Sequence, residues 1–121
     1  MKPIMQNKFY DRVKDIRGNC MTACVASILE LPIHEVPNFH DMKKTYTEAL
    51  VEFIGGLDKD IIYHGANDMP SGYCIATGPS PRDASIYHVV IMKDGEYIHD
   101  PHPDSTFILS VSGYYTIESD K

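Results

Sequence analysis

A cysteine at the start of an apolar run is the first residue of this sequence that could carry chemistry. Cys20 stands in the segment RGNCMTACVAS, which spans residues 17–27. Asn19 precedes it, and asparagine favours the N-cap position of a helix, so a helix is predicted to begin at Cys20. The positive end of a helix and a nearby imidazolium both lower the pKa of a thiol from about 8.5. Cys20 is therefore a candidate nucleophile if the chain supplies a base, and otherwise it is a small residue of the core.

The segment YHVVIMKDGEYIHDPHPD, residues 87–104, contains the candidate base and its partner. Asp94-Gly95 indicates a β-hairpin turn, and two loop lengths fit it. A two-residue loop turns Asp100 to the face of the sheet opposite His88. A three-residue loop over residues 93–95, with its glycine left-handed, places His88 directly opposite Asp100, with β-carbons about 4.5–5.5 Å apart. We expect the three-residue loop, because in this register the imidazole and the carboxylate share one face.

These residues predict a Cys-His-Asp triad. His88 would take the thiol proton of Cys20 and deliver it to the leaving group, while Asp100 would hold the imidazole in one tautomer and orientation. The chemistry indicates a cysteine hydrolase that cleaves an amide bond through a thioacyl intermediate. Transfer of the acyl group to an amine instead of water would make an acyltransferase, and both acceptors stay open. The expected partner is a peptide, a protein tail or a small amide, and no cofactor is expected.

The surrounding pattern predicts an α+β fold, with N-terminal helices packed on an antiparallel β-sheet. Residues 1–17 lack periodicity and are expected to form an extended arm or loop. One helix is predicted over residues 20–31, ending before Pro32, with one inward face, and a second from Asp41 to Ile54, stopped by Gly55-Gly56. The inward face of the first helix is expected to comprise Cys20, Ala23, Cys24, Ser27, Ile28 and Leu31. Strands are predicted at 61–64, 73–77, 86–92, 96–100 and 114–117, and the third should be a central strand because it is apolar on both faces.

Composition excludes several classes of function. The 121 residues indicate one domain, residues 1–121, with a net charge of −6 and no cluster among the 11 lysines and arginines. Nucleic acid is therefore an unexpected partner, because phosphate binding depends on clustered cations. No apolar stretch has the length of a signal peptide or a membrane span, so we expect no membrane association and a cytoplasmic location. The three cysteines form an odd count and are expected to be free thiols.

The chain resembles the papain-like cysteine peptidase superfamily in the segments GNCMTACVAS and HVVIMKDGEYIHDPHP. It is most similar to the compact bacteriocin-processing peptidase domains of exporters and to small bacterial and phage proteins, which also share LPIHEVPNF and TGPSPR. The resemblance implies the papain-like fold and a triad in the chain order Cys20, His88, Asp100. It also implies a glutamine shortly before the cysteine that binds the oxyanion. Lys14 stands six residues upstream instead, so Gln6, the only glutamine, is the candidate, and the backbone N–H of Cys20 is the second oxyanion donor.

Other residues have alternative interpretations. Asn19 and Arg82 are the candidate substrate-binding residues. Arg82 lies on the loop before the histidine strand, where it would clamp a substrate carboxylate or stay solvated. Cys24 and Cys74 are expected to pack in the core. The types of His99, Asp100, His102 and Asp104 suit a metal site, but two prolines break their spacing, so no metal is expected; His102 and Asp104 should shape the loop, with His99 facing away from His88. The rival to an enzyme is a catalytically inactive papain-like binding module, and a third hypothesis is a metal-binding protein.

Overall fold

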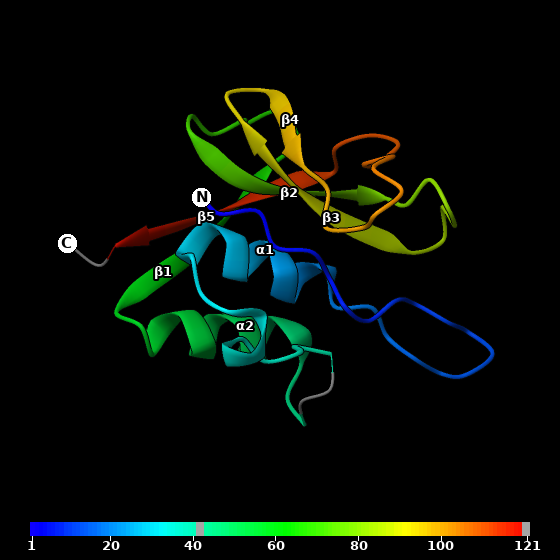
Figure 1. Cartoon of the computed structure of the whole chain (residues 1–121). Helices are drawn as coiled ribbons and strands as arrows, with labels where there is room; N and C mark the ends of the chain where they lie inside the picture. Colours follow the sequence, from blue (N-terminus) through cyan, green and yellow to red (C-terminus); the bar gives the residue numbers. More distant parts are fainter. Residues whose placement is uncertain (41–42, 120–121) are drawn as a thin grey trace.

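The computed structural model describes residues 1–40 and 43–119 and has a small α+β architecture. Two α-helices precede a five-stranded antiparallel sheet, in which the strand order is β1-β5-β2-β3-β4. Figure 1 shows both helices on the same side of the sheet, where α1 packs against β3 and α2 against β1. The elements are α1 (Cys20–Leu29), a 3₁₀ helix (Ile33–Glu35), α2 (Tyr46–Gly55), β1 (Lys59–Gly65), β2 (Tyr73–Pro79), β3 (Tyr87–Lys93), β4 (Glu96–His99) and β5 (Gly113–Ser119).

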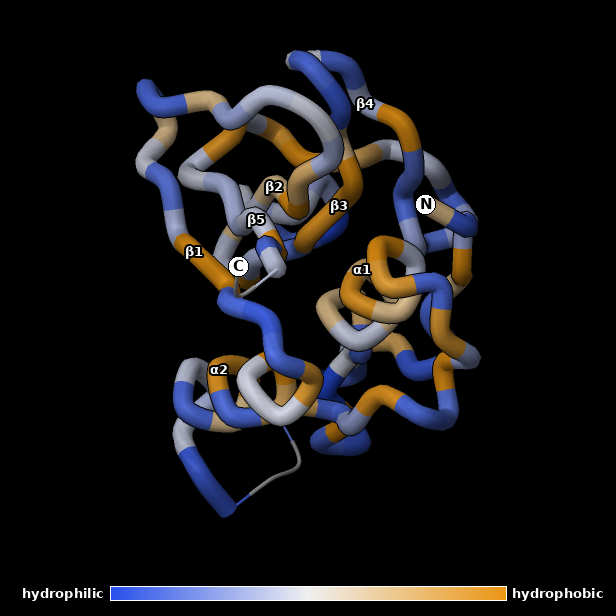
Figure 2. The backbone as a smooth tube through the Cα atoms, turned by 90° about the vertical axis from the view of Figure 1, so that its left-hand side faces the viewer, coloured by the Kyte–Doolittle hydropathy of each residue, from blue (hydrophilic) through white to orange (hydrophobic). Residues whose placement is uncertain are grey.

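The strand β3 is internal to the sheet and is buried from His88 to Met92. Successive side chains of a strand point to opposite faces. Val89 and Ile91 accordingly join a core cluster with α1 and α2, whereas Val90 and Met92 join a second cluster with Ile108. The prediction of a strand covered on both faces is confirmed. Figure 2 shows the hydrophobic segments of α1, β2 and β3 where these elements pack together.

The hairpin between β3 and β4 differs from the predicted register. Lys93 pairs with Glu96, so the turn has two residues, and both Asp94 and Gly95 have positive φ, 50° and 85°. The expectation of a three-residue turn is wrong, because this pair of left-handed residues forms the tight turn that matches the twist of the two strands.

A β-bulge in β4 places the Asp100 carboxylate on the face of the sheet that carries His88. Met92 pairs with Tyr97, but Ile91 pairs with His99, so Ile98 is an extra residue in β4. An inserted residue shifts the alternation of side chains by one. Asp100, directly after β4, therefore returns to the same face as His88, even though the two residues are not directly opposite.

Helix α1 is buried on all sides rather than on the single predicted face. Every residue from Met21 to Ser27 is buried, because the N-terminal arm covers the side that the sheet leaves open. The backbone N–H groups of Lys2 and Ile4 donate to Ser27, to its carbonyl at 3.0 Å and its hydroxyl at 2.9 Å. The helix ends at Leu29, where Glu30 adopts a left-handed conformation.

The arm, residues 1–8, is extended as predicted (Figure 1), and besides Ser27 it is fastened to β4, to the loop after β4 and to Asn19. The carbonyl of Ile4 contacts His99 Nε2 at 2.8 Å, and the Gln6 N–H donates to the carbonyl of Pro101 at 3.0 Å. Asn19 Oδ1 accepts the N–H groups of Asn7 and Lys8 at 3.1 and 2.9 Å. Asn19 is the N-cap residue of α1, but its side chain makes no cap hydrogen bond, because the arm occupies its oxygen.

Helix α2 begins later than predicted, at Tyr46. The hydroxyl of Thr45 accepts the N–H of Glu48 at 3.2 Å and caps the helix. The start predicted at residues 41–42 lies outside the described residues, and residues 43–45 are not helical. The helix ends at Gly55, one residue beyond the predicted end at Ile54, and it packs against β1. Within residues 1–40 and 43–119, no helix is long and apolar enough to cross a bilayer.

A glycine is required opposite His88 in the neighbouring strand. Gly78 pairs with His88, and a Cβ atom at this position would overlap the backbone carbonyl of Ser110. We therefore expect Gly78→Ala to lower the free energy of unfolding by about 1–3 kcal/mol, the usual cost of overpacking. Gly65→Ala in β1 is the control, since nothing lies within 4 Å of its added Cβ. Chemical denaturation of both variants checks this, and equal stability of the two would contradict it.

Candidate active site

Only one of the three thiols lines the main cavity of the described structure. Cys20 is the first residue of α1 and is partly exposed, whereas Cys24 and Cys74 are buried in the two core clusters. Burial raises the pKa of Cys24 well above its usual value and that of Cys74 to about 11. These two thiols pack in the core, as the sequence predicts. All three cysteines are free.

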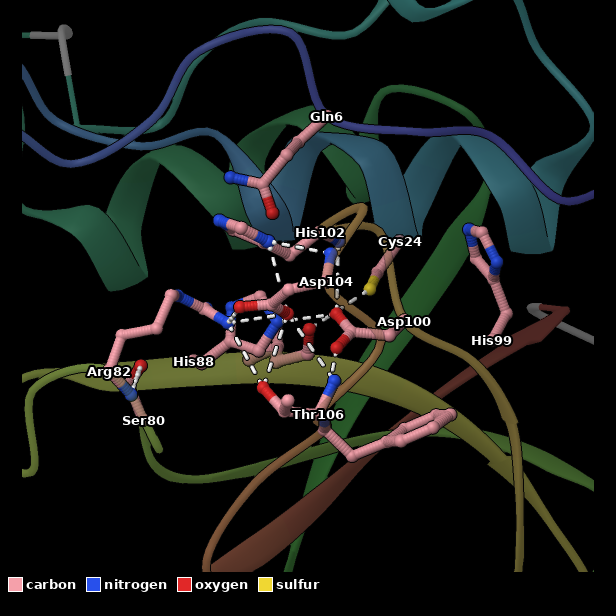
Figure 3. Close-up of polar contacts among 12 residues, drawn as sticks. Gln6, Cys24, Ser80, Arg82, His88, His99, Asp100, His102, Asp104 and Thr106 are labelled. Carbon is pink, nitrogen blue, oxygen red and sulfur yellow. Dashed lines mark hydrogen bonds and ion pairs between the residues drawn. The ribbon is translucent and has the colours of Figure 1, made fainter.

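His88 and Asp100 form a buried pair next to Cys20. His88 Nε2 lies 2.7 Å from Asp100 Oδ1, and both residues are almost completely buried. Asp100 also accepts the backbone N–H groups of His102 and Phe107, each at 2.9 Å. Burial alone would raise the pKa of Asp100, but the hydrogen bonds from His88 and from these two N–H groups lower it. The carboxylate is thus held as an anion in one orientation (Figure 3).

Cys20 also interacts with this imidazole. Burial alone would lower the pKa of His88, but hydrogen bonds with Asp100 and Cys20 and the negative charges of both outweigh it and raise the pKa to about 9. Because Nε2 is bound to Asp100, Nδ1 is the ring nitrogen that can exchange a proton with Cys20. The structure therefore brings the three residues of the predicted triad together in the order thiol, imidazole, carboxylate.

Gln6 reaches the same cavity through the arm. Its side chain is buried and lines the cavity with Cys20 and His88. Nε2 donates to the Lys8 carbonyl at 2.9 Å, and Oε1 is buried without a hydrogen-bond partner. An amide nitrogen carries two N–H groups, so one N–H of Gln6 is not used by the Lys8 carbonyl. Residues 9–17, closed by a bridge between Asp11 and Ile16, take up the extra length between the glutamine and the cysteine.

The cavity has a volume of about 590 Å³, within the usual range for small-molecule sites. Its walls are rich in phenylalanine and tyrosine rings, none of which belongs to a residue predicted for the site. They come from the loop after the arm, from the first turn of α2 and from two strands, so no local pattern could reveal them. The aromatic side chains that line it are Phe9, Tyr10, Tyr46, Tyr87 and Tyr115.

Arg82 lines the cavity and is exposed, as a solvated loop arginine would be, but its guanidinium is paired with a carboxylate of the protein. Its Nη1 lies 2.9 and 2.8 Å from the two carboxylate oxygens of Asp104. The backbone N–H of Asp104 donates to His102 Nδ1 at 3.1 Å, and burial together with the charge of Arg82 lowers the pKa of His102. His102 and Asp104 therefore organise the loop after β4, as expected. Asn19, the other candidate for substrate binding, is buried under the arm and does not line the cavity.

The remaining histidine of the segment points elsewhere. His99 bonds the arm and lies apart from His88 in Figure 3, as predicted. Among residues 1–40 and 43–119, no three histidine, cysteine or acidic side chains are grouped so as to hold a metal ion.

The charged state of His88 predicts a pH-dependent stability. Its pKa of about 9 in the folded protein exceeds the ordinary value of 6.5, so the folded state binds the proton more tightly. This stabilisation is complete below pH 6.5 and is lost as the pH rises through about 9, with a magnitude of about 3 kcal/mol. The difference in unfolding free energy between the wild type and His88→Gln should shrink across this interval. Chemical denaturation at several pH values checks this, and a constant difference would contradict it.

No family model, no curated protein and no solved structure matches the chain. The functional conclusion therefore depends on the geometry of Cys20, His88, Asp100 and Gln6.

Proposed function

We propose that the protein is a cysteine hydrolase that cleaves an amide bond with Cys20, His88 and Asp100. The observation that carries this proposal is the contact of a partly exposed thiol at a helix start with an imidazole whose second nitrogen is bound to a buried carboxylate. Two features support a papain-like fold. The helices precede an antiparallel sheet, and the cysteine, the histidine and the aspartate follow one another in this order along the chain. Three free thiols support a cytoplasmic location.

The mechanism follows from the positions of the groups. His88 Nδ1 takes the proton of the Cys20 thiol, and the sulfur attacks the carbonyl carbon of the amide. The negative charge on the carbonyl oxygen is stabilised by the backbone N–H of Cys20 and the free N–H of Gln6. His88 then protonates the leaving amine as the C–N bond breaks. Water, deprotonated by His88, attacks the thioester and releases the carboxylic acid and the thiol.

Two alternatives share this site. An amine in place of water would accept the acyl group and make the protein an acyltransferase. A catalytically inactive binding module would keep the fold without turnover, and the placement of Gln6 beside Cys20 favours an enzyme instead. The substrate is a peptide, a protein tail or a small amide, with no role for nucleic acid or a membrane.

An intact-mass search for an acyl adduct tests the proposal. The purified protein is incubated with cell extract and then acid-quenched, which preserves a thioester. We expect an added mass on Cys20 that is absent in Cys20→Ala and present in the control Cys24→Ala. Absence of any adduct, together with failure of a vinyl-sulfone probe to label Cys20 in a His88-dependent manner, would favour the binding module.

A further inference from the structure

The charges that line the cavity are paired, with one exception. Among the described residues, the permanently charged side chains of the lining are Arg17, Arg82 and Asp83. Arg82 is paired with Asp104 at 2.8 Å, and Asp83 lies 3.4 Å from Arg12 and accepts two hydrogen bonds from Ser85. Arg17 makes no hydrogen bond or ion pair with any residue in 1–40 or 43–119. Among these three lining side chains, Arg17 is therefore the one without a charged partner in the described part of the protein.

The backbone that carries Arg17 is fixed next to the nucleophile. Arg17 is three residues before Cys20, and the intervening Gly18 also lines the cavity. A Cβ at Gly18 would lie 3.2 Å from the backbone nitrogen of Tyr10, so the segment is packed closely against the following loop. The N–H of Asn19 donates to the carbonyl of Lys8 at 3.2 Å. These contacts fix the backbone between Arg17 and Cys20, two residues that line the same cavity.

The charges around Cys20 favour a bound ligand that carries a single negative charge. The chain as a whole has a net charge of −6, so an unpaired cation in its main cavity is not the result of a basic surface. The charge of His88 is balanced by Asp100, whereas the N-terminus of α1, at Cys20, adds a partial positive charge. A carboxylate matches one guanidinium in charge and in planar geometry. A phosphate monoester, with nearly two negative charges, would find only one unpaired cation.

We propose that Arg17 binds a carboxylate of the substrate, so that the protein acts on amides that carry a carboxylate close to the scissile carbonyl. This inference rests on the proposed function, because it concerns the substrate of the same thiol. The aromatic rings of Tyr46, Tyr87 and Phe9 would contact the apolar parts of such a substrate.

Two alkylating reagents of nearly equal size test the inference. Iodoacetate carries a carboxylate and iodoacetamide a neutral amide in its place. In both reactions the sulfur of Cys20 forms a bond to the CH₂ carbon, iodide leaves, and His88 takes the thiol proton. The measured quantity is the rate constant for iodoacetate divided by the rate constant for iodoacetamide. Both reactions are followed by intact mass, and the modification is assigned to Cys20 by peptide mapping. We expect this ratio to exceed that of glutathione, and Arg17→Gln to lower it about tenfold, with the iodoacetamide rate nearly unchanged.

Two further variants serve as controls. Arg17→Lys keeps the charge and should retain most of the preference for iodoacetate. Lys14→Gln removes one positive charge from the same loop, but Lys14 is exposed and does not line the cavity, so its ratio should equal that of the wild type. An unchanged ratio in Arg17→Gln, with Cys20 still labelled by both reagents, would overturn the inference and leave the proposed function standing. If neither reagent labels Cys20 in a His88-dependent manner, both the inference and the proposed function are overturned.

Discussion

The Cys20→Ala variant is expected to lose all turnover, a fall of at least about 10⁴-fold, because no group remains to form the thioacyl intermediate. His88→Gln should lose nearly as much, because both the activation of the thiol and the protonation of the leaving group depend on this imidazole. Hydrolysis of a substrate identified from its acyl adduct, or labelling by a vinyl-sulfone probe, measures the effect. Circular dichroism should show an unchanged fold in Cys20→Ala, since the thiol is partly exposed.

Cys24→Ala is the matched control for this substitution. Cys24 lies one turn along the same helix, is completely buried and does not line the cavity. Its replacement should lower stability by about 1–2 kcal/mol through a small cavity and leave activity close to that of the wild type. Full activity in Cys20→Ala, or a similar loss in both variants, would refute the assignment of the nucleophile.

The triad illustrates what the sequence could and could not predict. Cys20 and His88 were found because each lies inside a regular element, where local pattern fixes its position. Asp100 was assigned correctly to the face of His88 but for the wrong reason. The glycine of the turn is compatible with two loop lengths, and the extra residue lies at Ile98 in β4 instead. A bulge at this position leaves no mark in the pattern of residues, since it depends on the packing of the loop after β4.

The N-terminal arm shows a second limit of the sequence. The segment has no periodicity, so nothing in it indicates that Gln6 lies beside Cys20. Its position is decided by contacts of the arm with Asn19, His99 and Pro101, which all lie outside the arm. Asn19 has the right residue type for a cap, but two backbone N–H groups of the arm compete successfully for its oxygen. Arg82 likewise meets Asp104 only after the chain has folded.

Asp100 is expected to matter less than the other two residues, and its replacement separates two roles. Asp100→Asn keeps the shape of the side chain but removes the anionic hydrogen-bond acceptor that, together with Cys20, raises the pKa of His88 to about 9. We expect the rate to fall about 10²-fold, within the range for general acid–base catalysis, because fewer imidazole rings have a productive tautomer and charge. The alkaline limb of the pH–rate profile, near pH 9 in the wild type, should shift toward pH 6.5.

Asp100→Ala tests whether the carboxylate also holds the loop after β4. It removes the acceptor for the N–H groups of His102 and Phe107 as well as the partner of His88. Each buried donor left unpaired costs about 1–3 kcal/mol, so this variant should be markedly less stable than Asp100→Asn, as measured by chemical denaturation. If both variants keep full activity and the alkaline limb stays near pH 9, the site is a Cys–His dyad and Asp100 belongs to the structure of the loop. If both lose activity but only Asp100→Ala loses stability, the carboxylate serves the imidazole through its charge and the loop through its shape.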